Sequence, residues 1–332
     1  MGVLHRTIGQ MLPHPHLWPP LIGAALGFAL ILWASFEVAR RWDGLGRRAR
    51  WRAFAAVALF ETAYWLNVYA WLIEPNLLIV QRVEIVSENW RGAPITIAAL
   101  GDTHVPGPHM SVARMGAIVA RVNTLRPDLV LLLGDYVASH ESEAERSSFE
   151  QSQVLAGIAT FADLSAPLGV VGVLGNHDAW YSRESVTRAL EEAGVAALWD
   201  RHVVISRPSG DVVIAGLADD DTADPQYSDA IDGAPADGDT IVLSHTPDMF
   251  VEVPPGPALM LGAHSHCGQV TIPLIGRPIL PLQHRRFACH RIDEAGKIIF
   301  VTAGLGTSYI PVRFLNPPEI VLIHLRGAPA AD

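Results

Sequence analysis

The 332-residue chain has little charge and few cysteines. Charged residues make up 17% of the sequence, whereas 50% is apolar. Disordered chains are polar and highly charged, so this composition excludes them. Two cysteines, Cys267 and Cys289, cannot form a disulfide framework, and Cys267 lies in a histidine-rich segment, so we interpret both as free thiols. The formal net charge of −10 argues against nucleic acid as a partner.

Several catalytic motifs are also missing. The chain has no Gly-x-x-x-x-Gly-Lys-Ser/Thr phosphate loop and no dinucleotide fingerprint, which argues against a nucleotide-dependent enzyme. It has no His-Glu-x-x-His motif, which argues against a zinc peptidase of that kind. The glycine-rich segment 304–308 lacks a nucleophile elbow, so we interpret it as a turn and not as part of a serine hydrolase.

Long apolar runs, in contrast, occur near the N-terminus. Residues 17–36 contain no charge and are long enough to cross the hydrocarbon core as a helix. Residues 53–73 are nearly as apolar but contain Glu61 and Asn67. A charge near a helix centre costs about 2.5–3.5 kcal/mol on insertion, so an interfacial helix is the alternative for this second run. We expect residues 1–75 to form a membrane region, a transmembrane helical hairpin.

The segment between the two runs, residues 40–52, carries six arginines and one acidic residue. Basic loops of this kind stay in the cytoplasm. If both runs cross, the body of the protein lies on the far side, which in a bacterium is the periplasm. If only the first run crosses, the body lies at the cytoplasmic face. We expect a protein of the bacterial inner membrane with a periplasmic body, and the cytoplasmic face is the alternative.

From residue 76 onward, short apolar runs mix with a few amphipathic segments. This pattern predicts a layered α/β domain over residues 76–327, followed by a tail at 328–332. The acidic run that begins at residues 219–221 is interpreted as a solvated surface segment. Helices are expected over 111–125, with Ser111 as N-cap, and over 182–193. The expected strands are 77–80, 83–86, 95–100, 129–133, 170–174, 203–205, 212–215, 241–243, 259–261, 298–301 and 320–323.

Residues that bind metals follow five of these strands directly. Because α/β folds place active sites at strand ends, we expect these loops to meet. The set comprises Asp102, His104, Asp135, Asn176, His245, His264 and His266. Oxygen and imidazole ligands suit divalent metals such as Mn, Fe or Zn. Seven ligands are too many for one tetrahedral zinc, but they suit two metals that share a bridging carboxylate.

These residues form an ordered series of motifs. The series is Asp-x-His at 102–104, Gly-Asp at 134–135, Gly-Asn-His-Asp at 175–178, a lone His245, and His-x-His at 264–266. Over residues 77–326 the chain resembles the calcineurin-like metallophosphoesterase family, in particular its membrane-associated bacterial branch of UDP-2,3-diacylglucosamine hydrolases and related phosphodiesterases. The resemblance implies a four-layer αββα sandwich. One departure is Ala263, which stands where the family usually has a glycine before the first histidine.

The resemblance also implies a role for each residue. The two metals would be held by two triads, Asp102–His104–His266 and Asn176–His245–His264. Asp135 would bridge both metals. His177 would protonate the leaving-group oxygen, and Asp178 would orient the His177 imidazole.

We therefore expect a membrane-anchored, dinuclear metal-dependent phosphoesterase, specifically a phosphodiesterase in which a hydroxide bridging the metals attacks phosphorus and a P–O bond breaks. The alternative is a lipid-linked pyrophosphate hydrolase of the UDP-diacylglucosamine type, and the remote alternative is a non-catalytic metal-binding membrane scaffold. The substrate would be a phosphodiester or a lipid-linked phosphate. Arg285, Arg286 and Arg313 are candidates to pair with its phosphate, with ordinary surface arginines as the alternative. Nothing in the sequence indicates the oligomeric state.

Overall fold

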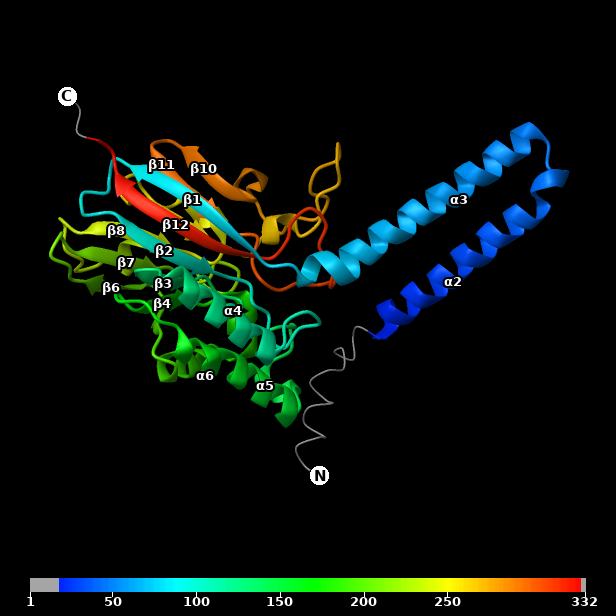
Figure 1. The fold of residues 1–332 in the computed structure, drawn as a ribbon. Coiled ribbons are helices and arrows are strands. Elements are labelled where there is room, and N and C mark those ends of the chain that lie inside the picture. The colour runs from blue at the N-terminus through cyan, green and yellow to red at the C-terminus, as the bar shows by residue number, and fades with distance from the viewer. Residues whose placement is uncertain (1–17, 330–332) are drawn as a thin grey trace.

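The protein consists of two long apolar helices joined to an α/β body (Figure 1). The computed structural model describes residues 18–329. Residue 17 of the first expected span and residues 330–332 of the expected tail lie outside the described residues. The mixed α/β organisation expected from the sequence is confirmed.

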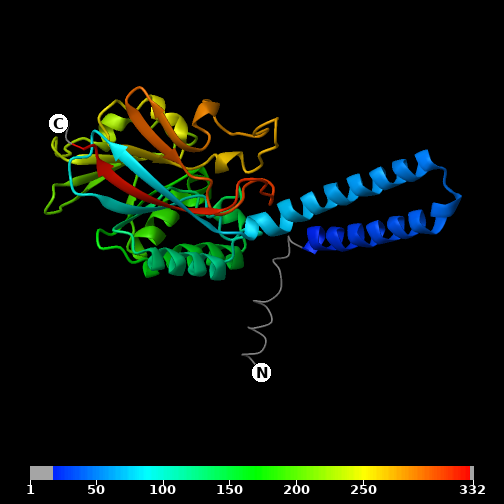
Figure 2. The ribbon, with the colours of Figure 1, turned by 45° about the horizontal axis from the view of Figure 1, so that its top comes forward.

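The two helices, α2 (Trp18–Arg41) and α3 (Arg47–Val68), run antiparallel and side by side (Figures 1 and 2). The Tyr64 hydroxyl on α3 donates a hydrogen bond to the Ala24 carbonyl on α2 at 2.7 Å. Both helices are long and apolar enough to cross a membrane, and their side chains are largely exposed. Because each helix extends into the basic segment, the connection between them is short.

The end of the hairpin is fastened to the body. Helix α3 continues as a π-helical turn, Tyr69–Ile73, and a 3₁₀ turn, Glu74–Asn76. Glu74 is fully buried, and its carboxylate accepts the backbone N–H groups of Leu315 and Asn316 at 2.9 and 2.5 Å. A buried carboxylate is tolerated only when donors surround it, so these bonds fix the hairpin to the 313–316 loop.

Two six-stranded sheets form the body. The first has the order β1 (Ile79–Ser87), β12 (Glu319–Gly327), β2 (Ile95–Leu100), β3 (Leu129–Leu132), β4 (Val170–Val173), β5 (Ala196–Leu198). The second has the order β10 (His290–Glu294), β11 (Lys297–Val301), β9 (Leu259–Gly262), β8 (Asp239–Leu243), β7 (Val212–Gly216), β6 (Arg201–Ile205). Strands β2 to β5 are parallel, as are β7, β8, β9 and β11.

Three hydrophobic clusters separate the layers. One contains side chains of both sheets, such as Leu131 and Ile241. A second lies between the first sheet and helices α4 (Val112–Leu125), α5 (Ser148–Ala159) and α6 (Asn176–Glu192). The third lies on the outer face of the second sheet, which is covered by the short helix α7 (Tyr227–Ala230) and the 3₁₀ turns Pro247–Val251 and Arg285–Phe287. The helical cover is thus substantial on one side and fragmentary on the other.

The individual elements mostly follow the expected pattern. Ser111 caps α4, since its side chain accepts the Arg114 N–H at 3.2 Å. Helix α6 begins six residues earlier than expected, because residues 176–178 form its first turn, and it is kinked where Ser182 has extended backbone angles. The two runs expected at 77–80 and 83–86 form one continuous strand, β1. The elements that the pattern did not reveal are α5, α7, β5 and β10.

Candidate active site

The loops that follow β2, β3, β4, β8 and β9 meet at one edge of the two sheets. The Asp102 N–H donates to the Gly134 carbonyl at 3.0 Å, which joins the first two loops. The His245 ring nitrogen Nδ1 lies 2.7 Å from the Leu133 carbonyl oxygen, which joins the second sheet to the first. Six of the seven candidate ligands lie in these loops, Asn176 begins α6 directly after the loop that follows β4, and none of the seven is more than 9% exposed. The structure therefore brings the whole set together.

Three of the candidates form a first cluster. His104 Nε2 lies 3.1 Å from His266 Nε2, which lies 4.0 Å from Asp102 Oδ2. These three ligand atoms all lie within 4.8 Å of one another. Asp102 Oδ2 is buried and accepts no hydrogen bond. A buried carboxylate oxygen without a donor is costly, and a divalent cation between these atoms would satisfy it, so the cluster fits a metal.

A second cluster lies beside it. His264 Nδ1 is 3.0 Å from Asn176 Oδ1 and 3.2 Å from His245 Nε2. Asp135 Oδ2 faces both clusters, at 3.3 Å from His245 Nε2 and 3.7 Å from His104 Nε2. This arrangement of imidazole, amide and carboxylate donors fits a second divalent ion. Asp135 lies between the two clusters, where one carboxylate could contact an ion in either of them.

Burial keeps most of these imidazoles in the neutral form, which is the form that binds a metal. Burial lowers the pKa of His104 to about 3 and that of His264 to about 4, so both rings are neutral near pH 7 and keep a lone pair. For His245, burial also favours the neutral ring, but the Asp135 carboxylate outweighs it and raises the His245 pKa well above its ordinary value. A metal at this site would replace the proton that Asp135 otherwise stabilises on His245.

The backbone around the site is strained. Non-glycine residues rarely adopt positive φ, yet five of the seven candidates do. They are Asp102 (52°), His104 (48°), Asp135 (55°), His264 (62°) and His266 (48°). The crowding extends to Gly175, where a Cβ atom would collide with Asp135 Oδ1. The surrounding fold holds these residues in costly conformations, which is typical of functional sites.

His177 lies at the rim of the clusters. Its Nε2 atom is 3.9 Å from Asp135 Oδ2 and 3.5 Å from the Ser308 hydroxyl oxygen. Its Nδ1 atom lies 2.7 Å from the Ser139 carbonyl oxygen, so Nδ1 carries a proton and Nε2 faces the site. Ser139 was not expected to take part, and no sequence motif marks a backbone carbonyl.

The prediction that Asp178 orients His177 is wrong. The Asp178 carboxylate accepts four backbone N–H groups at 2.8–3.1 Å, from Gly175, Asp135, Tyr136 and Val137. Burial and the Asp135 carboxylate raise the Asp178 pKa to about 7, while these hydrogen bonds oppose the rise. Asp178 therefore ties the loop after β3 to the loop after β4, and Ser139 orients the imidazole.

The three candidate substrate arginines lie in different surroundings. Arg286 is exposed and pairs with Glu294 at 2.8 Å, and Arg285 donates to a neighbouring carbonyl. Arg313 is fully buried and donates to the carbonyls of residues 303, 306 and 316. One of its nitrogens lies 3.4 Å from His266 Nδ1. Arg313 is therefore not a surface arginine, and a substrate cannot reach it. It lies instead beside the candidate ligand His266.

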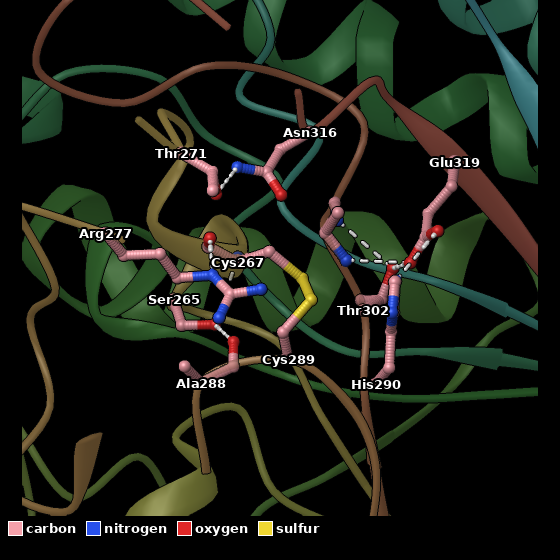
Figure 3. The surroundings of a disulfide bond; sticks show 12 residues. Ser265, Cys267, Thr271, Arg277, Ala288, Cys289, His290, Thr302, Asn316 and Glu319 are labelled. Carbon is pink, nitrogen blue, oxygen red and sulfur yellow. Dashed lines mark hydrogen bonds and ion pairs between the residues drawn. A yellow bond between two sulfur atoms is a disulfide. The ribbon is translucent and has the colours of Figure 1, made fainter. Parts of the chain in front are cut away.

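The two cysteines are not free thiols. Cys267 and Cys289 form a disulfide, with their Cα atoms 4.7 Å apart (Figure 3). The pairing arises because the loop after β9 lies against the segment that enters β10, and a 22-residue separation in sequence gives no sign of this. Cys267 directly follows His266 and shares its positive φ. The disulfide thus braces the loop that carries the last candidate ligand.

Part of the acidic run also lies at the site. Asp219 is fully buried and not solvated, and it accepts hydrogen bonds from the Thr222 and Thr246 hydroxyls. Asp221 Oδ2 lies 3.7 Å from His264 Nε2. These residues follow the expected strand at 212–215, so the strand-end argument used for the other loops would have found them.

The comparison with known proteins agrees with the series of motifs that carries the candidate ligands. A family model described as calcineurin-like phosphoesterase matches residues 95–268, a range that includes all seven candidate ligands. Phosphodiesterase YaeI of Escherichia coli (strain K12) is 28% identical over 259 residues, which cover 75% of this chain and 87% of that protein. A Danio rerio protein named transmembrane protein with metallophosphoesterase domain is 29% identical over 262 residues, covering 74% and 56%. UDP-2,3-diacylglucosamine pyrophosphatase LpxG of Chlamydia muridarum is 25% identical over 330 residues, covering 77% and 92%.

Proposed function

The chain belongs to the calcineurin-like phosphoesterase family and is a hydrolase of phosphoric esters, and from this premise we propose that it is a membrane-anchored phosphodiesterase with two metal ions. The observation that carries the proposal is the pair of adjacent clusters that Asp135 faces from between, 3.7 Å from His104 in one and 3.3 Å from His245 in the other, the first of which contains the unpartnered Asp102 oxygen. We propose residues 1–75 as the membrane region and 76–327 as the catalytic domain.

In this proposal the two triads, Asp102–His104–His266 and Asn176–His245–His264, would each hold one ion, and Asp135 would contribute a ligand to both sites. The donor set suits Mn, Fe or Zn. When bound, two divalent ions offset the charge of phosphoryl oxygens and make hydroxide available near neutral pH. Behind the ligands, Asp178 holds the loop after β3 and the loop after β4 together, and Arg313 contacts the His266 ring.

His177 supplies the proton for the leaving group. Because its Nδ1 proton is held by the Ser139 carbonyl, a second proton on Nε2 makes the ring an imidazolium acid. Transfer of the Nε2 proton to the departing oxygen leaves a neutral imidazole that is still oriented by Ser139.

The side of the membrane separates the two candidate substrates. We propose the periplasmic face of a bacterial inner membrane, because disulfides such as Cys267–Cys289 persist in oxidising compartments and the basic segment between α2 and α3 favours the cytoplasm. The second candidate, hydrolysis of a lipid-linked pyrophosphate at the cytoplasmic face, is supported by the similarity to a protein named for that activity.

Two measurements test the proposal together. Alkaline phosphatase fused to the C-terminus should be active and a fluorescent protein there should be dark. The purified, metal-loaded full chain should hydrolyse glycerophosphodiesters faster than a UDP-linked diacylglucosamine. A bright fluorescent fusion with preference for the pyrophosphate would replace the proposal by the second candidate. Failure to hydrolyse any phosphoester would refute both.

A further inference from the structure

A cavity of about 1020 Å³ lies between the hairpin and the candidate metal clusters. One wall comes from α2 and α3 and includes Ala24, Ala63 and Trp71, and the other comes from the body and includes His104, His177 and Ser308. We infer that this cavity binds a hydrocarbon chain of a lipid substrate whose phosphodiester lies at the clusters. The inference rests on the proposed function and names its substrate class.

The cavity extends to the candidate metal clusters. His104 and His177, which line its inner end, lie 3.7 and 3.9 Å from Asp135 Oδ2. A molecule with its phosphate near Asp135 therefore has its next atoms in this cavity. The volume is at the upper end of the range typical of small-molecule sites, about 300–1,000 Å³, and is sufficient for a chain with its ester linkage.

The lining selects for an apolar occupant. Among the described residues that line the cavity there is no Asp, Glu, Lys or Arg. A nucleotide or sugar diphosphate would lose its hydration there without gaining charged partners. Tyr64 is held in the wall by its bond to the Ala24 carbonyl, and Asn67, the polar residue that made the second apolar run ambiguous, also faces the cavity. Most of the surface that these helices offer is hydrocarbon.

A second surface feature indicates that a membrane lies against the side of the body from which the hairpin leaves. The loop 270–281 projects on the side of the body from which the hairpin leaves (Figure 2). It exposes Leu274, Ile275 and Ile279, the last two at 72% and 65%. Exposed apolar side chains beside an apolar hairpin are expected to enter the same bilayer. Lipid is then the molecule most abundant at the opening.

The test uses a series of p-nitrophenyl alkyl phosphates, from ethyl to decyl, with the full chain in lipid nanodiscs. In each reaction an oxygen from water bonds to phosphorus and the aryl P–O bond breaks. The p-nitrophenolate leaves as an anion, and the alkyl phosphate keeps its chain. For the wild type, kcat/KM should rise with chain length, by up to about fourfold per methylene group that becomes buried.

Partitioning into the nanodisc would also favour long chains, so matched variants isolate the cavity. Ala63→Trp fills it, whereas Ala55→Trp places the same side chain at an exposed position of α3 that does not line it. The decyl-to-ethyl ratio of kcat/KM should fall at least tenfold in Ala63→Trp and remain at the wild-type value in Ala55→Trp. Equal ratios in the two variants would overturn the inference while leaving the phosphodiesterase proposal intact.

A binding measurement decides the inference even without turnover. A decyl phosphonate with a terminal diazirine is not hydrolysed, and on illumination it should label residues of the cavity in the wild type and in Ala55→Trp but not in Ala63→Trp. Equal labelling of all three proteins would overturn the inference. Labelling of the cavity combined with no hydrolysis of any ester would instead refute the phosphodiesterase proposal alone.

Discussion

The disulfide beside the candidate ligands should make a measurable contribution to stability. Replacing Cys267 and Cys289 by serine, or reducing the bond, releases a crosslink between positions 22 residues apart. The loop-entropy relation gives a loss of about 3 kcal/mol for a closed loop of this length. For a domain of this size, roughly 2–4 °C of Tm are lost per kcal/mol, so Tm should fall by about 6–12 °C.

Removal of the disulfide should also weaken metal binding. Cys267 and His266 both have positive φ, and the bond through Cys267 helps to keep the loop in this conformation. Without it, an ion at the cluster of Asp102, His104 and His266 should bind more weakly than an ion at the neighbouring cluster. Metal analysis after dialysis should then give fewer than two ions per chain.

The assay is thermal unfolding of the full chain in detergent, with and without reductant. The double serine variant is its own control, because reductant should not shift its Tm further. An unchanged Tm on reduction, together with two thiols that react with an alkylating agent in the unreduced protein, would refute the reasoning and restore the interpretation of both cysteines as free.

Two further predictions concern the site itself. Asp135→Ala should abolish activity and metal content together, because it removes the carboxylate that faces both clusters; normal turnover with two metals retained would end the dinuclear assignment. His177→Gln should keep both metals and lower kcat by about 10²–10⁴-fold for alkyl leaving groups, but much less for an aryl ester whose anion departs without a proton. Equal losses on both substrates would show that His177 positions the phosphate instead.

The sequence predicted the parts of this protein that depend on local pattern. Strand-length apolar runs located most of the strands, and polar residues directly after them located all seven candidate ligands. Both follow from rules that act within a few residues: alternation or continuity of apolar side chains, and the position of loops at strand ends. The expected cap at Ser111 is of the same kind.

What the sequence did not reveal depends on pairs of residues far apart in the chain. The Cys267–Cys289 bond requires the order of β9, β11 and β10 in the second sheet. The buried state of Arg313 requires the loop 313–316 to pack against the π-helical turn Tyr69–Ile73, where the Arg313 backbone N–H donates to the Ala70 carbonyl at 3.0 Å. The Ser139 carbonyl that holds His177 has no residue type to identify it. Tertiary packing decides each of these cases.

The buried Glu74 has a consequence for how such an enzyme would meet its substrates. Only Leu77 and Leu78 lie between the last helical turn of the hairpin and β1, so no flexible linker connects the hairpin and the α/β body. A domain on a flexible tether explores a range of heights above a membrane, whereas a body joined this rigidly to a membrane-spanning hairpin would stay at a single height above the bilayer. Its metal clusters would sample one plane parallel to the membrane, and the rate of encounter would follow the surface density of phosphodiesters in that plane and not their concentration in the bulk solution.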